Sequence, residues 1–506
     1  MNLEVVLPDE STLELFERFQ DWPWPVLLHS ADAVSADSRW DIISAAPDSV
    51  LVIDAQQHAG NVSNYPDGVT LLAALRAKLA PLAQGPAVTQ ASIGASARVD
   101  AGHVSEDRDR HDCASTSDDV EPPPFRWGAL GYLGYEALHP SYGMSIGNNR
   151  TPAVGSTAAA PLEHSPDIPT AAFGVYRWSL CVDRRLKRAW LSAADGNDPV
   201  VAAVLKCLAQ PRTQHEAHAG LCTRPTEAPP EPQYLNAFAR VQAYLRAGDC
   251  YQVNIARRFR VPDRVHAWTL FKQLLPVQPG AFAGFMQTPR GTVLCFSPER
   301  LIRTRGKAIV SQPIKGTIAR GASGAADQQQ ANKLRASTKD RAENLMITDL
   351  TRNDLGRVCR TGSVQVDQLF GLRTLPAVYH LESTISGELR SEVDTLEALA
   401  ACFPAGSITG APKRRAMQII RELEPVSRSV YCGSIGYLDH TGDCDFNVAI
   451  RTLVADQSAV YCWGGGGIVA DSDAQAELQE IELKVGSLMR ATRGARPPAP
   501  GESTAD

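Results

Sequence analysis

The sequence predicts an α+β protein in which helices and strands intermix to build a mixed α/β layered fold. Three observations lead to this prediction. Helical periodicity and period-two strand patterns alternate from residue 233 to residue 490. The length of 506 residues exceeds the roughly 250 to 300 residues at which one hydrophobic core stops growing, so two units or one double-layered unit are expected. The hydrophobic share of 44% and the charged share of 21% are typical of globular proteins and exclude a disordered, collagenous or membrane-embedded chain.

The first part of the chain carries strand patterns and one helical segment. PVLLHS, SVLVIDA and RWSLCVD read as strands, because β-branched and aromatic residues recur in short runs. VTLLAALRAKLAPL has its apolar residues at helical spacing. Few reactive groups occur in this part, so we expect the chemistry to lie further along the chain.

Three stretches combine many Pro, Ser, Ala and charged residues with few aromatic residues; they cover residues 84–124, 143–168 and 211–232. Such segments bury too little apolar surface to fold, so we predict poor order there. The third stretch is the predicted boundary between an N-terminal half, residues 1–210, and a second domain, residues 233–492. A tail over residues 493–506 is predicted to be disordered for the same reason.

A helix and a strand are predicted directly after the boundary. In YLNAFARVQAYLRAGD, apolar residues form one helical stripe, and Gly248 is a helix stop signal. The next segment, CYQVNIARRF, alternates with period two and places Gln252 and Asn254 on one face.

Charge and cysteine use exclude several classes of function. Lys and Arg number 50 against 56 Asp and Glu, a balance of −6, so no positive field favours nucleic acid. The eleven cysteines form no C-x-x-C pair, which argues against a zinc site and for reduced thiols. No stretch reaches the roughly 18 apolar residues that span a bilayer, and MNLEVVLPDE lacks a secretory pattern. We therefore expect a cytoplasmic protein with neither a membrane nor a nucleic-acid partner.

A hairpin pattern brings an acid and an amine together. The segment LCFSPERLIRTRGKAIVSQPIKGT has two β-rich arms around the turn Arg305–Gly306–Lys307. Folding at that turn places Glu299 and Lys315 within about 10 Å of each other. The pair has two interpretations, a general acid beside a nucleophilic amine or a cross-strand ion pair.

Two predicted helices each carry a carboxylate pair on one face. Asp340 and Glu343 form one pair and Glu477 and Glu480 the other, both at spacing i and i+3. Carboxylates from two converging helices provide partial coordination for Mg²⁺, with open positions for a substrate. The alternative is a solvated face on which Glu480 pairs with Lys484.

Two further motifs suggest contact with anions. The run Gly464–Gly467 indicates either a close approach of a carboxylate to backbone N–H groups or a flexible hairpin. In GSITGAPKRRAMQIIRELE, the residues Lys413, Arg414 and Arg415 begin a predicted helix, where the helix dipole disfavours cations. A bound anion would relieve this conflict, and three solvent-exposed side chains are the alternative.

Arg451 lies in FNVAIRTLV, which we predict as a strand with Arg451 on the same face as Asn447 and Ala449. A buried guanidinium at this position requires a carboxylate partner. That partner is either a ligand or a structural ion pair.

Taken together, these segments resemble the chorismate-binding enzymes. This family includes component I of anthranilate synthase, component I of aminodeoxychorismate synthase, and the isochorismate and salicylate synthases. The matching motifs are SPERLI, PIKGT, KDRAEN, DLTRNDLGRV, SITGAPK and GGGGIVADS followed by ELQE, in family order between about residues 234 and 490. The resemblance implies one fold in which two sheets from both halves pack together with helices outside.

Two positions imply a branch within that family. Isochorismate and salicylate synthases carry a water-activating Lys where this chain has Gln252, and an amide cannot act as a base near neutral pH. Lys315 in PIKGT is similar to the aminodeoxychorismate synthases, whereas anthranilate synthases carry Ala there. The resemblance thus implies a Mg²⁺-dependent amino-group transferase that converts chorismate to 4-amino-4-deoxychorismate, for p-aminobenzoate and folate. An anthranilate synthase component I and a non-catalytic regulator that binds chorismate or tryptophan are the alternatives.

The resemblance also implies roles for individual residues. Lys315 attacks C2 of chorismate, and Glu299 protonates the departing C4 hydroxyl. Mg²⁺ is held by Glu343 and Glu480, with Asp340 and Glu477 in support. The implied substrate-binding residues are Gly465, Gly466, Gly467 and Lys484 at the ring carboxylate, Tyr431 and Arg451 at the enolpyruvyl carboxylate, and His380, Ser407 and Gln252 near the reacting ring.

Two further implications concern other molecules. Ser30 in LLHS lies where relatives bind tryptophan, although His29 stands in place of their Glu. Ammonia is expected from a separate glutamine amidotransferase subunit, because the chain has no G-x-C-x-G nucleophile turn. We expect a product that keeps its enolpyruvyl group, without pyruvate release.

Overall fold

The computed structural model describes residues 1–5, 10–31, 38–54, 68–83, 121–139, 165–211, 226–375 and 378–492. The stretches predicted to be poorly ordered, 84–124, 143–168 and 211–232, lie for the most part outside these ranges, and the tail 493–506 lies outside them entirely.

Two antiparallel sheets form the centre of the described structure. The first sheet has, in spatial order, β1 (Asn2–Val5), β8 (Arg188–Ala193), β7 (Trp178–Asp183), β3 (Trp40–Ser44), β2 (Val26–His29), β10 (Phe282–Gln287), β11 (Gly291–Ser297), β20 (Thr452–Asp456), β21 (Val460–Ile468), β9 (Gln252–Val261) and β17 (Gly410–Ala411). The second sheet has β14 (Ile314–Ala319), β16 (Val378–Glu388), β13 (Ala308–Gln312), β12 (Arg300–Arg305), β19 (Cys444–Asn447), β18 (Ser434–Asp439), β5 (Gly128–Leu133), β6 (Ala171–Tyr176) and β4 (Ser49–Ile53), and β15 (Gln365–Thr374) pairs with β16.

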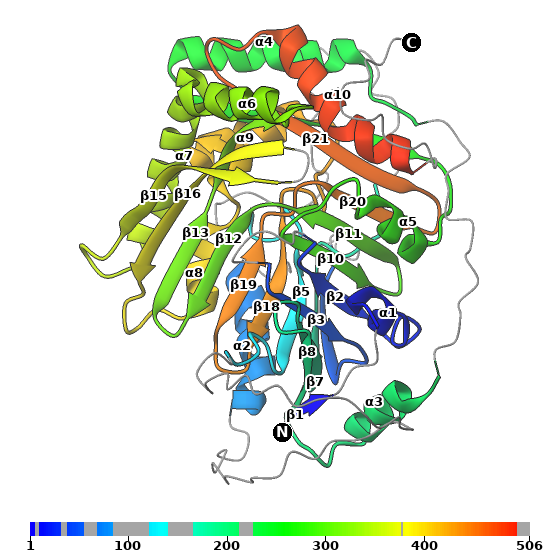
Figure 1. Cartoon of the computed structure of the whole chain (residues 1–506). Coiled ribbons are helices and arrows are strands. Elements are labelled where there is room, and N and C mark those ends of the chain that lie inside the picture. The colour runs from blue at the N-terminus through cyan, green and yellow to red at the C-terminus, as the bar shows by residue number, and fades with distance from the viewer. Residues whose placement is uncertain are drawn as a thin grey trace.

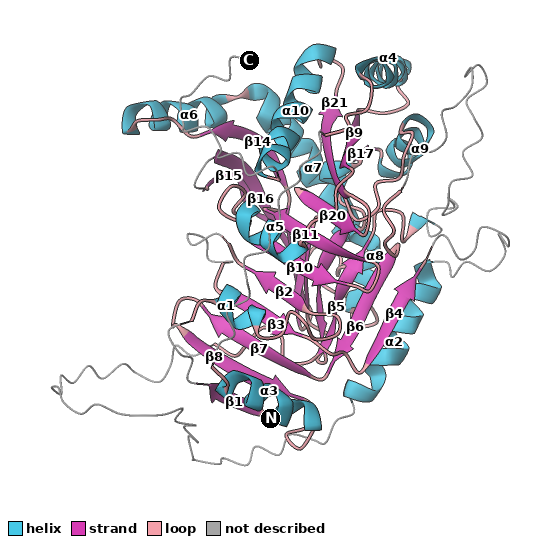
Figure 2. Cartoon of the chain, turned by 90° about the vertical axis from the view of Figure 1, so that its right-hand side faces the viewer, coloured by secondary structure: helices cyan, strands magenta, loops and turns pink. Residues whose placement is uncertain are grey.

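Helices surround these sheets on the outside (Figures 1 and 2). They are α1 (Thr12–Glu17), α2 (Gly68–Ala83), α3 (Pro199–Ala209), α4 (Glu231–Ala247), α5 (Ala267–Leu274), α6 (Gly324–Ala336), α7 (Thr338–Gly356), α8 (Thr395–Cys402), α9 (Lys413–Leu423) and α10 (Ala474–Ala491), with a short 3₁₀ helix, η3 (Gly406–Ile408). The predicted α+β class, with two sheets and outer helices, is confirmed.

Both sheets combine strands from before residue 211 and after residue 226, and their buried side chains belong to one large hydrophobic core. A shared core of this kind gives each half apolar surface that it does not bury alone. The division into an N-terminal half, residues 1–210, and a second domain, residues 233–492, stays a prediction.

Local sequence signals account for many of these elements. The predicted strands correspond to β2, β4 and β7, and the predicted helices correspond to α2 and α4. Gly248 ends α4 with a left-handed φ of 78°, a conformation that glycine adopts without a Cβ penalty. In α10, apolar residues at helical spacing are buried against the core, namely Leu478, Ile481, Val485 and Leu488.

The two helices with carboxylate pairs, α7 and α10, pack against the sheets. α7 packs against β14 and β16, and α10 packs against β21. Strand β21 lies in the first sheet and β14 in the second, so the two helices approach one region from different sheets. Within the ranges given above, no helix is long and apolar enough to cross a membrane.

Candidate active site

Glu299 is a buried carboxyl at the junction between β11 and β12, with 3% of its surface exposed. The Ser407 hydroxyl, in η3, donates a hydrogen bond of 2.6 Å to its Oε1 atom. Burial raises the pKa of Glu299 to about 7, although the Ser407 hydrogen bond and the charge of Lys315 work in the opposite direction. A carboxyl with a pKa near neutrality is suited to give up a proton during a reaction.

The predicted hairpin forms with its turn at Gly306. β12 pairs with β13 in a register that places Arg305 opposite Ala308 and Arg300 opposite Gln312. The chain then passes into β14, which pairs with β16 instead of β12. Lys315 thus comes from the neighbouring strand. No ion pair joins Glu299 to Lys315 among the described residues, and Glu299 instead accepts a hydrogen bond from Ser407.

Lys315 is partly buried in β14. Burial lowers the pKa of its amine, and the nearby cation Lys484 lowers it further, whereas the charge of Glu343 raises it. A larger neutral fraction makes a lysine amine more nucleophilic. The Nζ atom lies 3.4 Å from the position that a β-carbon on Gly467 would occupy, so the amine faces the glycine run.

His380 lies in β16 on the strand pair that carries Lys315. It is buried, and its Nδ1 atom lies 2.7 Å from Oγ1 of Thr317, the residue opposite it in the sheet. Burial lowers the pKa of His380 to about 3, and the cations Arg451 and Arg373 lower it further. The imidazole is therefore neutral at physiological pH and serves as a hydrogen-bonding group.

The four glycines Gly464–Gly467 form the end of β21 and pair with Arg257–Asn254 of β9. The alternative of a flexible hairpin is therefore wrong, because all four residues are held in a sheet ladder. Close neighbours would collide with β-carbons at all four positions: Val485 at Gly464 (2.4 Å), Asn254 at Gly465 (2.7 Å), Glu477 at Gly466 (2.8 Å) and Gln252 at Gly467 (2.3 Å). The run thus gives side chains from β9 and α10 access to the strand backbone.

The polar face of β9 is buried and not fully hydrogen-bonded. Gln252 is fully buried, and neither polar atom of its side-chain amide has a partner; Oδ1 of Asn254 has none either. Unpaired buried amides are costly. Their position beside Gly465 and Gly467 makes these amides available to hydrogen-bond a polar ligand at the glycine strand.

Carboxylates from α7 and α10 lie near Lys315. The charges of Glu343 and Glu480 both act on the pKa of the Lys315 amine. Burial raises the pKa of Glu343, and the neighbouring carboxylates Asp340 and Glu477 raise it further. The acids therefore repel one another, as they would in a site for a cation.

Lysines partly balance this acidic group. Lys484 lies 2.7 Å from Oε1 of Glu480 and also donates a hydrogen bond of 3.1 Å to the carbonyl of Gly465. Burial alone would raise the pKa of Glu480, but the charge of Lys484 and its hydrogen bond lower it. Lys339 lies 3.9 Å from Oε1 of Glu477, which also accepts a hydrogen bond from Ser472. Among the described residues, no three His, Cys, Asp or Glu side chains are grouped so that they alone could hold a metal ion.

Tyr431 lies beside the glycine strand, and Arg451 directly precedes β20, the strand that pairs with β21. The hydroxyl of Tyr431 is 3.2 Å from the position of a β-carbon on Gly465, and its ring stacks on Trp463 with centroids 6.2 Å apart. Arg451 donates a hydrogen bond to the side chain of Gln278.

The strand predicted around Arg451 is interrupted. β19 ends at Asn447 and β20 begins at Thr452, and Arg451 lies between them with a left-handed φ of 52°. A positive φ breaks the alternation of faces, so the shared face with Asn447 and Ala449 is wrong. Its observed partner is the neutral amide of Gln278 and not a carboxylate, which leaves the guanidinium charge for a ligand.

Two of the three cations at the start of α9, Lys413 and Arg415, have protein carboxylate partners. Lys413 is buried and lies 2.5 Å from Oδ2 of Asp354, and Arg415 lies 3.1 Å from Oδ2 of Asp249. For Lys413, the two interpretations of this motif, a bound anion and a solvent-exposed side chain, were both wrong. Its partner is a carboxylate of the protein itself. Sequence reasoning missed Asp354, whose signal was its place in the matched motif DLTRNDLGRV.

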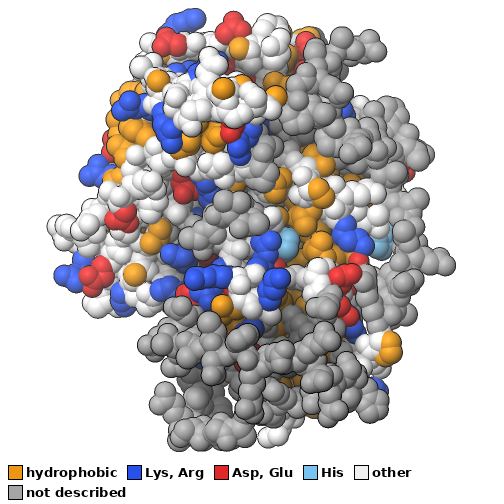
Figure 3. Space-filling view, in the orientation of Figure 1, with side chains coloured by type: hydrophobic (Ala, Val, Ile, Leu, Met, Phe, Trp, Pro, Cys, Tyr) orange, Lys and Arg blue, Asp and Glu red, His pale blue; other side chains and the backbone are white. Residues whose placement is uncertain are grey.

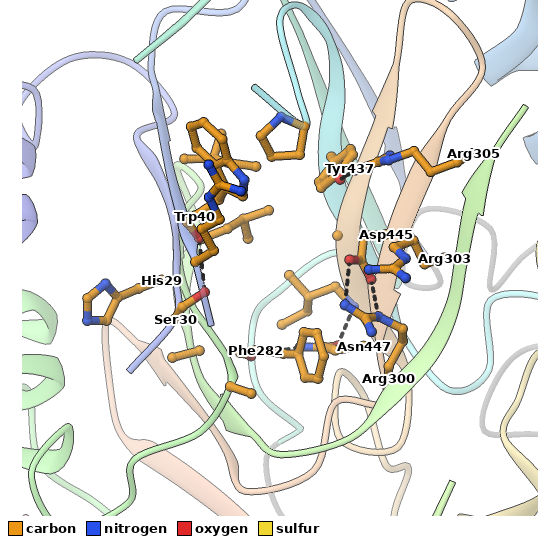
Figure 4. A pocket seen from close by; sticks show the side chains of 18 of the residues that line it. His29, Ser30, Trp40, Phe282, Arg300, Arg303, Arg305, Tyr437, Asp445 and Asn447 are labelled. Carbon is orange, nitrogen blue, oxygen red and sulfur yellow. Dashed lines mark hydrogen bonds and ion pairs between the residues drawn. The ribbon is translucent and has the colours of Figure 1, made fainter. Parts of the chain in front are cut away.

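A separate cavity of about 260 Å³ lies at the end of β2. Figure 4 shows Ser30 and Trp40 on one side of it and Arg300, Asp445 and Asn447 opposite, with the His29 ring directed away from the other labelled side chains. Ser30 is already bonded to the carbonyl of Trp40 at 2.9 Å. Tryptophan binding at Ser30 stays a prediction. In Figure 3, Lys and Arg side chains gather beside hydrophobic ones in the middle of the visible face.

Comparison with known proteins places this geometry in a family. The profile of the family described as chorismate binding enzyme matches residues 75–490. The chain is 38% identical over 477 residues to aminodeoxychorismate synthase component 1 of Klebsiella aerogenes, covering 94% of this chain and 95% of the relative. The protein of the same name from Escherichia coli (strain K12) is 37% identical over 475 residues, 94% of each chain. The crystal structure of anthranilate synthase component I from Streptococcus pneumoniae TIGR4 has the same fold, with a TM-score of 0.69 and 24% identity over 90% of this chain and 93% of that one.

Proposed function

Because the chain belongs to the chorismate binding enzyme family, we propose that it aminates chorismate at C4 with ammonia and yields 4-amino-4-deoxychorismate. The observation that carries this proposal is the joint placement of a buried acid, Glu299, and a partly buried amine, Lys315, which act on each other's pKa, with the amine facing Gly467. The relatives with 37–38% identity support the choice of product.

Glu299 is the proposed general acid. Its pKa of about 7 keeps a proton on the carboxyl in a large fraction of molecules near neutral pH. That proton goes to the departing C4 hydroxyl, which leaves as water. Ser407 then stabilises the carboxylate that remains, through the hydrogen bond that it already donates.

Lys315 is the proposed nucleophile. Its neutral amine forms a bond to C2 of the ring, the two ring double bonds shift, and the C4–O bond breaks as Glu299 gives its proton. Ammonia then forms a bond to C4, the double bonds shift back, and the C2–N bond to Lys315 breaks, while one proton of the added ammonia returns to the Glu299 carboxylate. Two allylic displacements replace one difficult substitution, and chorismate and ammonia are converted to the amine and water.

Chorismate carries two carboxylates, for which the site has separate cations. Lys484, above the glycine strand, is proposed to bind the ring carboxylate together with the backbone of Gly465–Gly467. Arg451, whose protein partner is a neutral amide, is proposed to bind the enolpyruvyl carboxylate with Tyr431. Gln252 and His380 would supply neutral hydrogen-bonding groups around the ring.

The acidic group fits Mg²⁺ as a cofactor. Its donors are carboxylate oxygens, and the raised pKa of Glu343 reflects burial and repulsion that a cation relieves. Glu343 and Glu480 would hold the ion, with Asp340 and Glu477 in support. When bound, Mg²⁺ neutralises charge between these acids and the ring carboxylate.

Ammonia is proposed to come from a separate glutamine amidotransferase subunit. The relatives are named as component 1, which agrees with a second component. The test of the function uses the purified chain with chorismate, ammonium and Mg²⁺, followed by product mass and a pyruvate assay. We expect a product that retains the enolpyruvyl group; fluorescent anthranilate with released pyruvate as the main product would contradict the proposal.

A further inference from the structure

Ser407 lies on a short loop, residues 403–409, which joins α8 to β17. The loop brings the serine hydroxyl to the carboxyl of Glu299. A one-turn 3₁₀ helix has little stability of its own. Other contacts must therefore hold the loop.

One buried ion pair lies at the start of this loop. Lys413, on the first turn of α9, is 2.5 Å from Oδ2 of Asp354 in α7 and donates a second hydrogen bond, 3.2 Å long, to the carbonyl of Cys402. Lys413 and Asp354 are 7% and 6% exposed. Asp354, Cys402, Ser407 and Glu299 also line one small cavity. The pair therefore lies close to Glu299, because Asp354 lines the same small cavity as the acid.

A second buried ion pair lies at the end of the loop. Arg428 is 1% exposed and pairs with Glu424 at 2.6 Å. Its remaining donors go to the carbonyl of Ile408, next to Ser407, and to the carbonyl of Asn254 in β9, both at 2.8 Å. Glu424 in turn accepts a hydrogen bond of 2.8 Å from the backbone of Ala256. This pair joins the loop to the strand that carries Gln252.

We propose that the Asp354–Lys413 and Glu424–Arg428 pairs are positioning residues that clamp the loop from both ends and so keep Ser407 hydrogen-bonded to Glu299. This inference rests on the proposed role of Glu299 as the acid. A buried ion pair adds little net stability compared with apolar side chains, but it fixes geometry. Here each pair donates one bond to a carbonyl of Cys402 or Ile408, on the two sides of Ser407.

Several groups face Glu299 and contribute to its titration. They are Lys315 from β14, Glu382 from β16, Ser407 from η3, Arg300 next in sequence, and Asp354 with Lys413 across the shared cavity. A clamp variant could therefore act on Glu299 directly or through Ser407. A double-mutant cycle with Ser407→Ala separates the two routes.

The test removes each pair as a unit, since a single substitution would leave a buried charge unpaired. The variants are Lys413→Met with Asp354→Asn, and Arg428→Met with Glu424→Gln, each made in the wild-type chain and in Ser407→Ala. We expect kcat to fall roughly tenfold or more in the wild-type background, as loss of a hydrogen bond to a charged group does. In the Ser407→Ala background the fall should be less than about twofold.

The pH profile gives a second readout that a purely structural role would not move. In the pH profile of kcat, the alkaline limb should move to higher pH with each clamp variant. When Ser407 is already Ala, adding a clamp variant should not shift the limb beyond its position in Ser407→Ala alone. If a double variant without the charged pair does not fold, Lys413→Arg and Arg428→Lys can be used in the same cycle. These two variants should retain more activity than the double variants. Arg415→Gln is the matched control, because Arg415 lies on the same turn of α9 in an exposed pair with Asp249; it should leave kcat unchanged.

Equal falls in both backgrounds, or an unmoved alkaline limb, would overturn the inference. The unsubstituted chain is assayed first and tests the function separately. An inactive wild-type chain would refute the proposed function. An active wild-type chain in which the effects of the clamp variants and of Ser407→Ala on kcat add would refute only the proposed clamp.

Discussion

The hydroxyl of Ser407 lies 2.6 Å from Oε1 of Glu299, although the two residues are 108 positions apart in the chain. Glu299 lies between β11 and β12, and Ser407 lies in η3. This bond stabilises the ionised form of Glu299, whereas burial, the larger effect, favours the neutral form. The balance leaves the pKa at about 7. Burial is therefore the largest influence on the acid strength of Glu299, and the Ser407 hydroxyl is the largest of the groups that oppose it.

Ser407→Ala should weaken the acid. Loss of the hydrogen bond removes stabilisation of the carboxylate, so the pKa of Glu299 rises, by roughly one unit for a bond worth about 1.4 kcal/mol. Since the acid must be protonated to act, activity is lost as pH rises through this pKa. The alkaline limb of the pH profile of kcat should therefore move to higher pH, with a lower plateau. Ser407→Thr keeps the hydroxyl and is the control; an alkaline limb at the same pH in wild type and Ser407→Ala would contradict this role.

Glu299→Gln should abolish turnover and change the pH dependence of stability. The carboxyl has a raised pKa in the fold, about 7 against 4.5, so its contribution to stability is fully present below pH 4.5 and is lost as pH rises to 7. Gln does not ionise. The free energy of unfolding of the variant relative to wild type should therefore increase between pH 4.5 and 7, by up to roughly 3 kcal/mol. Denaturant unfolding at several pH values measures this difference, and parallel curves would show that Glu299 ionises normally.

Lys315→Arg separates chemistry from charge. A guanidinium keeps the positive charge near Glu343 but cannot attack carbon, because its pKa exceeds about 12. We expect turnover to fall by roughly a thousandfold or more, and chorismate without ammonia to leave a ring adduct on the wild-type peptide that contains Lys315, detected by mass. A fully active Arg variant with an unmodified wild-type peptide would refute covalent catalysis.

The sequence predicted those parts of the site that depend on local pattern. The turn at Gly306, the helices that carry Glu343 and Glu480, and the strand that begins at Gln252 follow from periodicity and turn residues within about twenty positions. Such signals are local because they arise from backbone sterics and from one buried face. The family motifs then indicated which local pieces come together.

The features that were missed depend on distant partners or on single backbone angles. Lys413 was expected to meet an anion or solvent, but its partner is Asp354, 59 positions away. Arg451 was placed on a strand face, but one left-handed φ turned it out of the alternation. The polar face of β9, with Gln252, was not predicted to be buried. Neither hydrophobic periodicity nor charge spacing contains this information, because each depends on packing between sheets.

Glu480→Gln tests the proposed metal. The substitution removes one anionic ligand while the side chain, 53% exposed, leaves the core untouched. We expect the Mg²⁺ concentration for half-maximal activity to rise at least roughly tenfold, with weaker Mg²⁺ binding by calorimetry and an unchanged Tm. Glu482→Gln is the matched control on the same helix, since Glu482 is 50% exposed and pairs with Arg257, and it is not among the acids that act on the pKa of Lys315. Equal Mg²⁺ dependence in both variants would remove Glu480 from the metal site.

Gly467→Ala tests whether the open strand backbone is needed for the substrate. The added methyl group would lie 2.3 Å from Nε2 of Gln252 and 3.4 Å from Nζ of Lys315. The Gln252 amide is the end of a flexible side chain without partners, so it can move aside at a modest cost to folding. The methyl group, however, would fill the space between the amide and the nucleophile.

We therefore expect Gly467→Ala to reduce kcat/KM by roughly a hundredfold, which is about 2.7 kcal/mol of lost transition-state stabilisation, while Tm changes by no more than a few degrees. Gly356→Ala is the control, because a β-carbon at that position in α7 meets no atom within 4 Å and should alter neither quantity. The opposite result would be a Tm loss as large as that of a cavity-creating core substitution, with unchanged kcat/KM in the folded fraction. That result would show that Gly467 is needed for packing. Loss of kcat/KM at an unchanged Tm would show that glycine at position 467 serves the substrate and not packing, through the space at the strand backbone or through the placement of the Gln252 amide and the Lys315 amine.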